Sequence, residues 1–372
     1  MKIVLLYLGR KGAGPQYSIE YARALLDKGI DVYAIISSYS ENLKDWIALK
    51  NNYSEEHFAL KKVPTYTSIR SFICNSFNVY IYVSIITSIR KYSPALVLST
   101  LFHPWHNIIF LFLKKKFKRM KIVHDVKLHT GEDSFIRRIF NYIEIKNSDL
   151  YITLTETSKQ ELIKRGIPKG KICVIPHANF ACYVKNNILV KSESIHNRIA
   201  FIGRINKYKG LDVLLNAFDE IHKKMPQLKL LIAGDGNCEC YKDQFYKNKE
   251  SLELNLKWIA DDEFAAIIEN VDIVVLPYIE ATQSGIIPLA FAFGKTVVAT
   301  NVGGIPEQIP QGTGIIIPSN DSVALEKVIL HLYDNPDIIK TMSQAAFDYA
   351  RTELSWVRSV ELLMDFCKQY RC

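Results

Sequence analysis

The sequence lacks the features that define disulfide-rich, metal-binding and P-loop proteins. Seven cysteines stand at scattered positions among 372 residues, and their odd number predicts reduced thiols. Cys238 and Cys240 lie one residue apart, but no second Cys or His pair with ligand spacing accompanies them. No Asp-x-Asp motif and no Gly-x4-Gly-Lys-Ser/Thr pattern is found. The sequence therefore predicts neither a metal site nor a P-loop ATPase.

A long apolar run is also missing. The segment Met1–Leu8 is too short for a signal peptide with its flanks and cleavage site, and it predicts a first strand. The uncharged run Ser71–Ile89 contains Asn75, Asn78 and several Ser and Thr residues, which makes it a poor transmembrane span. We expect a cytoplasmic chain in which this run forms a buried or membrane-facing helix.

Acidic residues are scarce in the first half of the chain. Residues 1–190 carry 28 Lys and Arg against 14 Asp and Glu, a balance of +14, whereas residues 191–372 carry 19 against 24, a balance of −5. This asymmetry indicates an anionic partner for the first half, such as nucleic acid, an anionic membrane surface or an anionic substrate. Nucleic acid is disfavoured, because no recognised nucleic-acid motif accompanies the charge.

Both halves alternate strands with helices, which predicts an α/β fold with parallel sheets. We place an N-terminal domain at residues 1–183, a linker at 184–197, a second domain at 198–354 and a last helix at 355–372 that can pack back on the first domain. Two doubly wound domains would bring the carboxyl ends of both sheets to a shared cleft, where ligands bind. The expected strands are 2–8, 31–36, 95–99, 121–124, 150–154, 172–175, 198–202, 229–233, 256–258, 273–277, 296–299 and 314–317. The expected helices include 16–28, 68–92, 134–147, 158–165 and 355–369.

A basic turn follows the strand expected at 198–202. Gly203 ends the strand, Arg204, Lys207 and Lys209 stand in the turn, and an amphipathic helix begins near Leu211. A cationic turn at the carboxyl end of a strand, beside a helix N-terminus, is a place to hold phosphates. The alternative is a solvated basic turn without a ligand.

Two further turns of the second domain also indicate a site for a nucleotide or its phosphates. Gly234 ends the strand at 229–233 and leaves room for a nucleotide. The segment Pro277–Pro288 follows the next strand and opens a helix, so its backbone N–H groups predict a second anion seat. Two seats in one domain indicate a diphosphate held between them. The candidate residues of this segment are Glu280, Thr282, Gln283, Ser284 and Gly285.

The first domain carries a glycine turn and several histidines after its strands. Gly12 and Gly14 follow the first strand and allow a backbone to approach a ligand closely, although the spacing is not Gly-x-Gly-x-x-Gly. A plain glycine turn is the alternative. Histidines and a carboxylate at strand ends suit proton transfer or binding of sugar hydroxyls, while a hydrogen-bonded structural histidine is the usual competing explanation. These candidates are His103, His124, Asp125 and His129.

Taken together, these segments resemble glycosyltransferase family 4, a family of retaining enzymes with the GT-B fold that use nucleotide-sugar donors. The resemblance is strongest over residues 148–310. Its segments occur in the family's order, which is more specific than any one of them alone. They are Ser148–Glu156, Gly166–Lys169, Val174–His177, Phe201–Gly210, Ala233–Gly236 and Val297–Glu307.

The resemblance implies a role for each matching residue. Arg204 and Lys209 match the basic pair on the donor diphosphate, and His124 matches the histidine near the donor sugar. The implied fold is two Rossmann-like domains that face a central cleft. The matching backbone positions are Gly12 and Gly14 in the loop that faces the phosphates, and Ser284 and Gly285 in the loop that meets the distal phosphate.

One part of the family pattern is absent. The family often has Glu-x7-Glu, with the second glutamate on the ribose, and that position falls here on Leu289 or Ala290. Glu280 stands near the place of the first glutamate but is offset, with Thr282–Gly285 in its stead. The sequence is similar to a subset with an Ala-Thr-Gln-Ser-Gly loop, which is tied to bacterial surface polysaccharides.

The resemblance also implies a mechanism. A UDP- or GDP-sugar would be the donor and no cofactor or metal would be needed, because Arg204 and Lys209 with helix dipoles stabilise the leaving diphosphate. No carboxylate suits the role of nucleophile, so retention implies a front-face displacement in which the leaving phosphate helps to deprotonate the acceptor. The acceptor would be a glycan or a polyprenyl-diphosphate-linked glycan, in the synthesis of O-antigen, capsule or exopolysaccharide.

The basic first half indicates where such an acceptor lies. Ile108–Leu113 is apolar and is followed by Lys114–Lys121, with six cations in eight residues. Apolar residues beside a basic cluster favour an anionic lipid surface, so peripheral association with the inner face of the cell membrane is expected. A core helix that ends in a solvated basic turn is the alternative. Two other functions stay open: a GT-B sugar-nucleotide epimerase and a non-catalytic nucleotide-sugar-binding subunit.

Overall fold

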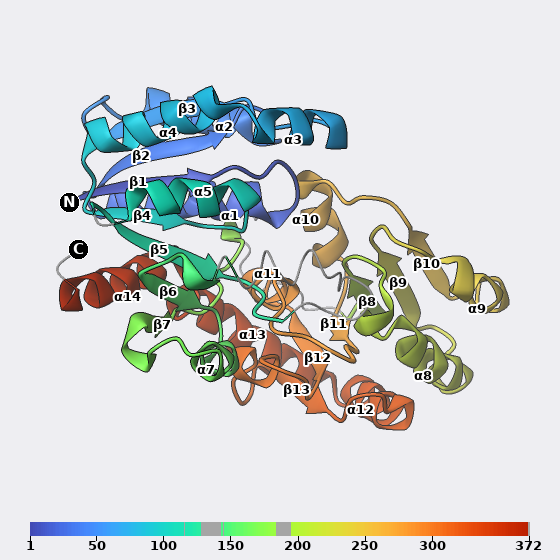
Figure 1. Ribbon diagram of the computed structural model, residues 1–372. Coiled ribbons are helices and arrows are strands. Elements are labelled where there is room, and N and C mark those ends of the chain that lie inside the picture. The colour runs from blue at the N-terminus through green and yellow to red at the C-terminus, as the bar shows by residue number, and fades with distance from the viewer. Residues whose placement is uncertain (115, 128–142, 144, 184–194, 371–372) are drawn as a thin grey trace. The chain divides into compact units, whose positions relative to one another are not determined.

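The fold is described by a computed structural model that covers residues 1–114, 116–127, 143, 145–183 and 195–370 (Figure 1). These residues form two compact units. Unit 1 comprises the described parts of Met1–Val126, Ser134–Ile175 and Trp356–Cys372, and unit 2 those of Lys127–Asp133 and Pro176–Ser355. The helix expected at 134–147 and the linker at 184–197 lie largely outside the described residues.

Unit 1 is built on a parallel seven-stranded sheet, as the strand–helix alternation predicts. The strand order is β3-β2-β1-β4-β5-β6-β7. β3 is not among the predicted strands, because Lys61 and Lys62 interrupt its apolar pattern at the edge of the sheet. The strands are β1 Lys2–Tyr7, β2 Asp31–Ser37, β3 Phe58–Val63, β4 Leu96–Ser99, β5 Lys118–Val123, β6 Leu150–Thr153 and β7 Ile172–Val174.

Helices cover both faces of this sheet (Figure 1). Ile3, Leu5 and Tyr7 of β1 pack with α1 and α14 in one apolar cluster, whereas Val4 and Leu6 pack with α4 and α5 in another. The period of two along β1 therefore supplies both faces, as expected for a sheet that is buried on both sides. The helices of unit 1 are α1 Ala13–Asp27, α2 Leu43–Asn51, α3 Ile69–Ser76, α4 Val79–Tyr92, α5 Pro104–Leu113, α7 Glu156–Lys164 and α14 Trp356–Gln369.

The basic run after α5 enters the sheet instead of staying on the surface. β5 begins at Lys118, before the predicted start at Lys121. The side chains of Arg119 and Lys121 are buried within it. The Arg119 guanidinium forms an ion pair with Asp149 at 2.8 Å and donates to the Phe110 carbonyl at 2.8 Å. Although burial raises it, the hydrogen bonds and charge of Arg119 bring the pKa of Asp149 below its ordinary value. Two of the six cations in the predicted surface cluster are thus structural.

The single helix predicted at 68–92 is two helices. α3 and α4 are bent by 66° at the break between them. The break is local in origin, because the Asn78 side chain accepts from the Tyr80 N–H at 3.1 Å and caps α4. Among the described residues no single helix is long and apolar enough to cross a membrane, and only this bent pair passes that test when its two helices are taken together.

Unit 2 is built on a parallel six-stranded sheet with the order β10-β9-β8-β11-β12-β13. α8 and α12 contribute to the cluster on one face, and α11 to that on the other. The strand predicted at 256–258 is wrong. The strand in this region, β10, lies earlier in the chain: it pairs Leu252 with Leu230 of β9 and ends before residue 256. Trp258, within the predicted strand, is exposed. The strands are β8 Arg198–Ile202, β9 Lys229–Ala233, β10 Leu252–Asn255, β11 Ile273–Leu276, β12 Thr296–Thr300 and β13 Gly314–Ile317. The helices are α8 Leu211–Lys224, α9 Lys242–Lys247, α10 Asp261–Glu269, α11 Ile286–Ala292, α12 Ser322–Asp334 and α13 Pro336–Thr352.

Residues 176–183 pack on unit 2, so the compact first unit ends before the predicted domain boundary at 183. The Asn179 side chain donates to the Ala350 carbonyl at 2.6 Å, and its backbone N–H donates to the Leu354 carbonyl at 2.8 Å. At the other end of unit 2 the chain passes into α14, which contacts α1 of unit 1.

The loops after β8, β9 and β11 touch through their backbones. Gly234 has φ +146°, and a Cβ there would lie 2.1 Å from the Gly203 carbonyl oxygen. Gly210 has φ +67°, and its Cβ would lie 1.9 Å from the Pro277 carbonyl oxygen. Only glycine satisfies both the backbone angle and the space at these two positions. The three loops are therefore held in one arrangement at the carboxyl edge of the sheet.

This close approach predicts the outcome of a matched pair of substitutions. Gly210→Ala combines a left-handed backbone with a steric clash and should lower the free energy of unfolding by about 3 kcal/mol or more. Gly312→Ala is the control, because Gly312 has φ +85° but no atom within 4 Å of the place that a Cβ would take. It should cost only about 1–2 kcal/mol for the backbone angle. Urea denaturation of both variants measures the difference, and equal losses would contradict the contact with Pro277.

Candidate functional site

The turn after β8 places a lysine on an aromatic ring. Lys209 ends the short 3₁₀ helix Lys207–Lys209, and its ammonium nitrogen lies 3.8 Å from the centroid of the Tyr278 ring. Tyr278 follows β11 and is buried. The two loops are joined by the Ile279 N–H, which donates to the Tyr208 carbonyl at 2.8 Å. The ammonium is thus fixed in position by a neighbouring loop.

The charge of Lys209 is not neutralised within the described residues, where it forms no ion pair with a carboxylate. A cation on a tyrosine face gains about 0.5–2 kcal/mol, and it keeps its full charge. A lysine held in this way remains available to an anion. Arg204 lies in the same turn and is exposed. The basic pair predicted from the sequence therefore stands on one loop at the carboxyl edge of the sheet.

The loop after β11 is organised by a glutamine. The Ser284 N–H donates to Gln308 Oε1 at 2.7 Å, and Gln308 Nε2 donates to the Ser284 carbonyl at 3.1 Å. The Ser284 hydroxyl also lies 3.2 Å from the Tyr278 hydroxyl, and it accepts from the Ile286 N–H at 3.3 Å. Two of the N–H groups expected to be free for an anion are therefore bonded internally. Among the described residues the Gly285 N–H has no hydrogen-bond partner.

The predicted donor-side residues of unit 2 are brought to one edge of the sheet. They follow the adjacent strands β9, β8 and β11, and the site takes in Tyr278, Gln308 and His177 as well. A Cβ added to Gly285 would lie 3.6 Å from His177 Nε2, which places that ring beside the loop. The predicted residues at this edge are Gly203, Arg204, Lys209, Gly234, Glu280, Thr282, Gln283, Ser284 and Gly285.

The two residues at the place of the family's ribose glutamate are buried in unit 2. Leu289 and Ala290 lie in α11, are 3% and 0% exposed, and belong to an apolar cluster of unit 2. A carboxylate at either position would be buried without a partner, which is costly. Glu280 is exposed. Recognition of a ribose therefore has to use groups other than a side chain at 289 or 290.

The glycine loop of unit 1 already has partners. The Gly12 N–H donates to Glu41 Oε1 at 2.9 Å. A Cβ on Gly14 would lie 2.9 Å from the Leu101 side chain and 3.1 Å from Tyr7, so packing by itself requires a small residue there. Glu41 could not be found from its sequence neighbourhood, because no pattern links it to the glycine loop.

His124 follows β5 and contacts α1. Its Nε2 donates to the Thr100 carbonyl at 2.9 Å, which assigns the proton to Nε2, and its ring meets the Tyr17 ring edge-on with centroids 5.0 Å apart. Burial lowers the pKa of His124, although the Thr100 carbonyl and the nearby exposed Asp125 oppose the shift. The imidazole is therefore neutral at pH 7 and presents a fixed tautomer.

His103, predicted on the acceptor side, is a buried helix cap in unit 1. It is 2% exposed, and its Nδ1 accepts from the Trp105 N–H at 3.2 Å, which caps α5. Burial lowers the pKa of His103 to about 3, so the ring is neutral. These contacts give His103 a structural role, and its place on the acceptor side stays a prediction. His129 lies outside the described residues.

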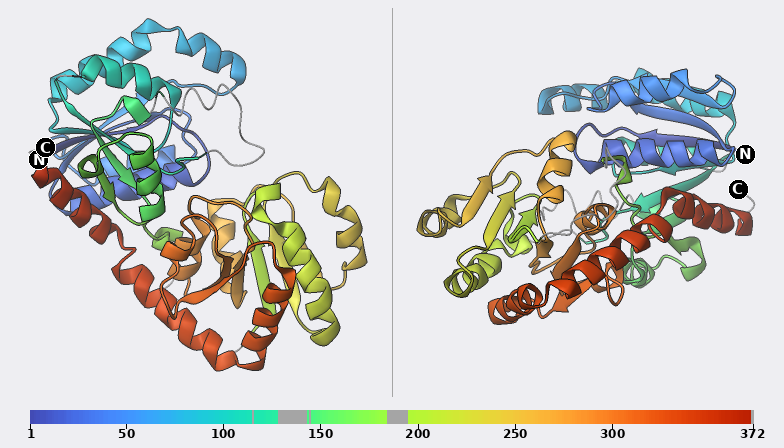
Figure 2. Two further views of the ribbon diagram at one scale, coloured as in Figure 1. Left: turned by 60° about the horizontal axis from the view of Figure 1, so that its bottom comes forward. Right: turned by 180° about the vertical axis from the view of Figure 1, so that it is seen from behind.

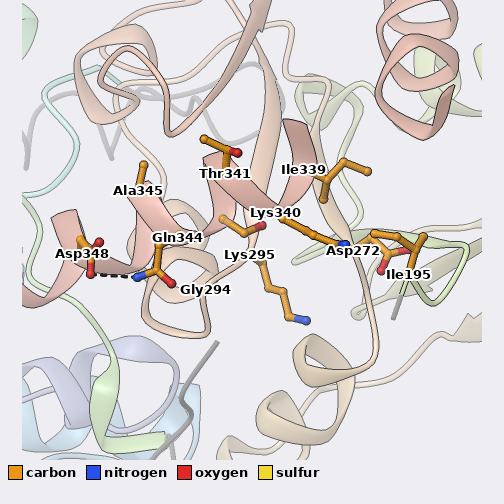
Figure 3. Close-up of a pocket in the computed structure, with 11 residues that line it drawn as sticks. Ile195, Asp272, Gly294, Lys295, Ile339, Lys340, Thr341, Gln344, Ala345 and Asp348 are labelled. Carbon is orange, nitrogen blue, oxygen red and sulfur yellow. Dashed lines mark hydrogen bonds between the residues drawn. The ribbon is translucent and has the colours of Figure 1, made fainter. Parts of the chain in front are cut away.

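A cavity of about 870 Å³ lies at the opposite, amino-terminal edge of the unit 2 sheet (Figure 3). Its polar groups serve the fold. Asp272 accepts from the N–H groups of His196 and Arg198 and from the Tyr333 hydroxyl, and Lys295 donates to the Glu269 carbonyl. This cavity is separate from the loops that follow β8, β9 and β11. Within the described part of the chain no group of three or more His, Cys, Asp or Glu side chains could hold a metal ion.

Two family models match the sequence: "Glycosyltransferase Family 4" over residues 15–178 and "Glycosyl transferases group 1" over residues 196–335. The D-inositol 3-phosphate glycosyltransferase of Corynebacterium efficiens is 26% identical over 250 residues, which are 62% of this chain and 59% of that protein. A GDP-mannose-dependent monoacylated alpha-(1-6)-phosphatidylinositol monomannoside mannosyltransferase of Corynebacterium glutamicum is 27% identical over 168 residues, or 42% of this chain and 43% of that one. The chain thus spans about three-fifths of the length of the first of these curated relatives.

Solved structures with low sequence identity share the fold. Anabaena HepE in complex with UDP has a TM-score of 0.74 and 15% identity, and the likeness covers 99% of this chain and 100% of that one. Sucrose-phosphate synthase of Thermosynechococcus elongatus has a TM-score of 0.72 and 16% identity over 100% and 98% of the two chains. The UDP-GlcNAc 2-epimerase of Neisseria meningitidis bound to UDP-GlcNAc has a TM-score of 0.65 and 15% identity over 99% and 100%.

Two parallel α/β sheets and these likenesses define the GT-B fold, as predicted. The fold by itself does not decide the activity, because a sucrose-phosphate synthase and a UDP-GlcNAc 2-epimerase share it. The two family models match the two halves of the chain, so in both halves the sequence is similar to glycosyltransferases of the family 4 type.

The buried histidine at the start of α5 predicts a pH-dependent stability. In the unfolded chain His103 takes up a proton below about pH 6.5, whereas in the folded chain it does so only near pH 3. Stability from this residue is therefore complete above pH 6.5 and falls with pH, by about 2 kcal/mol at pH 5.

We expect His103→Asn, which keeps a capping side chain, to lose less stability than the wild type when urea denaturation is repeated at pH 7.5 and pH 5.0. The exposed His331 supplies the control His331→Gln. An unchanged pH dependence in His103→Asn would show that the native ring is not held neutral.

Proposed function

We propose that the chain transfers a sugar with retention of configuration from a UDP- or GDP-sugar to a glycan or polyprenyl-diphosphate-linked acceptor, in the synthesis of bacterial surface polysaccharide. The observation that carries the proposal is the Lys209 ammonium, held 3.8 Å from the Tyr278 ring without a carboxylate partner in the described residues. A glycine-dependent loop that fixes a lysine in position, with no carboxylate partner among the described residues, is suited to bind an anion.

The leaving group explains why two cations are needed. Cleavage of the bond between sugar and diphosphate places new negative charge on the leaving oxygens, and fixed cations stabilise that charge without a costly rearrangement. Lys209 and Arg204 supply them, and the Gly285 N–H supports a distal phosphate oxygen. The proposed reaction uses no metal, because these groups take its place. The leaving phosphate then helps to remove the proton from the acceptor hydroxyl.

His124 enters the proposal as a contact of the donor sugar. Its imidazole is neutral, its pKa is lowered by burial, and its Nε2–H is committed to the Thr100 carbonyl. A neutral ring in a fixed tautomer accepts a hydrogen bond from a sugar hydroxyl through Nδ1. It is poorly suited to protonate a leaving group at pH 7.

The family matches favour transfer over epimerisation, and the likeness to an epimerase shows only the shared fold. The two reactions differ in their need for an acceptor. Release of nucleoside diphosphate that depends on an added acceptor supports transfer, and conversion of the nucleotide sugar without acceptor supports an epimerase. Donor binding with neither reaction supports a non-catalytic subunit.

The basic turn supplies a direct test with its own control. Arg204→Ala and Lys209→Ala should each reduce kcat/KM for nucleoside diphosphate release by about 10²–10³, because a charge that stabilises the transition state is lost. Lys207→Ala is the matched control, since Lys207 is exposed at the other end of the same 3₁₀ helix. It should stay within about twofold of the wild type. Wild-type turnover in both Arg204→Ala and Lys209→Ala would rule out the proposed site.

Nucleotide binding can be measured apart from turnover. We expect UDP or GDP, among UDP, GDP, ADP and CMP, to raise the thermal unfolding temperature of the wild-type chain through binding to the native state. Lys209→Ala should abolish this increase, and Lys207→Ala should keep it. A shift of equal size in Lys209→Ala would place the nucleotide away from the Tyr278 loop.

A further inference from the structure

Helix α3 of unit 1 has no buried residue, although half of its side chains are apolar or aromatic in a periodic pattern. Ile69 and Ile73 are one turn apart and are 81% and 52% exposed. The exposed apolar row continues through the break into the first turns of α4. We call the following residues the α3–α4 face: Ile69, Ile73, Phe77, Val79, Tyr80 and Val83, all between 52% and 86% exposed.

A helix that buries nothing within its own unit needs another reason to be apolar. α3 is not held by the core: it is formed by local capping, in which Ser68 and Ser71 exchange hydrogen bonds with each other's backbone. Three polar or partly exposed side chains of α3 turn inward: Phe72 and Ser76 meet Trp105 of α5, and Asn75 donates to the Thr65 carbonyl at 2.6 Å. The outward side chains of α3 therefore have no role in folding unit 1.

The charge around this face is of one sign. No Asp or Glu occurs in the 68 residues between Glu56 and Asp125, which contain eleven Lys and Arg. Arg119 and Lys121 are buried, but Arg70 on α3 and Arg90 and Lys91 at the end of α4 are exposed. A surface that combines exposed aromatic and aliphatic side chains with cations, and has no carboxylate nearby in the sequence, is complementary to an anionic lipid surface.

The neighbouring helix continues the same outer layer. α4 and α5 pack side by side on one face of the unit 1 sheet (Figures 1 and 2), and Arg90 donates to the Phe112 carbonyl at 3.2 Å. Leu111 and Phe112 of α5 are each 57% exposed, and Lys114 follows them at the surface. The exposed apolar residues of α5, together with Lys114 after its end, thus extend the α3–α4 face.

We propose that the α3–α4 face binds the surface of a membrane that contains anionic lipids, with Phe77 and Tyr80 at its centre. The bound helices lie in the plane of the interface and do not span the bilayer. α4 has 14 residues, about 21 Å, against a hydrocarbon core of about 30 Å. Its inner side is also committed to the core of unit 1 through Ile81, Ile85 and Ile89.

The α3–α4 face gives the lipid-linked acceptor of the proposed function a docking surface, and in that sense the inference rests on the proposed function. Its test needs neither donor nor acceptor. The purified full chain is floated with vesicles of phosphatidylcholine containing 30% phosphatidylglycerol (a composition chosen for about one anionic lipid in three) and with vesicles of phosphatidylcholine alone, at low and high salt. Turnover on a water-soluble acceptor is measured in parallel, so that failure of the chemistry is seen separately from failure of binding.

We expect binding to the anionic vesicles at low salt, weaker binding at high salt and little binding to phosphatidylcholine. The double variant Phe77→Ser/Tyr80→Ser should lose about 100-fold in partitioning, since burial of one aromatic side chain is worth about tenfold or more. Tyr246→Ser is the matched control, because Tyr246 is 76% exposed on α9 of unit 2. It should bind as the wild type does. Arg70→Gln/Lys114→Gln should weaken binding and reduce its dependence on salt.

The outcome that overturns the proposal is a double variant that floats with the anionic vesicles as well as the wild type, or a wild type that does not float at low salt. Size-exclusion chromatography with light scattering supplies a second readout. A concentration-dependent dimer that Phe77→Ser/Tyr80→Ser abolishes, without vesicle binding by the wild type, would assign the face to a second copy of the chain. Thermal unfolding of each variant confirms that the exposed substitutions leave the fold intact.

Discussion

Backbone-to-backbone contact between the loops after β8, β9 and β11 is the constraint on which unit 2 depends. At Gly210 and Gly234 the chain takes backbone angles that other residues avoid, and at both positions a carbonyl oxygen fills the space of a side chain. The contact between Gly210 and Pro277 brings the basic turn against the loop that carries Tyr278. Without that approach Lys209 would be a solvated lysine on a flexible turn, with no fixed position for an anion.

The structure treats its cations in two ways. Arg119 is buried, forms an ion pair with Asp149 and donates a hydrogen bond to a carbonyl, so its charge is satisfied within the protein and is not available to a ligand. Lys209 is placed on an aromatic ring, which holds the ammonium without neutralising it. This contrast separates structural cations from those that can serve a ligand, and net charge alone does not reveal it. The same distinction moves the proposed lipid contact from the basic run at 114–121 toward α3 and α4.

Strand ends explain why the sequence was enough to predict that several of the candidate residues of unit 2 lie at one edge of the sheet. In a parallel sheet every strand delivers its next residue to the same edge, so the turns that begin at Gly203, Gly234 and Pro277 lie at one edge once their strands are recognised. The partners that organise these residues were not predictable in this way. Gln308 reaches Ser284 from 24 positions along the chain, and Glu41 reaches Gly12 from 29, with no periodic pattern to join them.

The order of residues along the chain was enough to predict the α/β class, the parallel arrangement of elements and the basic turn at 203–210, because these depend on local periodicity and on residue type. Which side chains face a ligand depends instead on the folded molecule. Packing buries His103 as a helix cap and turns Leu289 into the core, and it leaves the outer side of α3 exposed. Such outcomes depend on which surfaces meet when helices and sheets pack, and packing brings together residues that no short stretch of sequence contains.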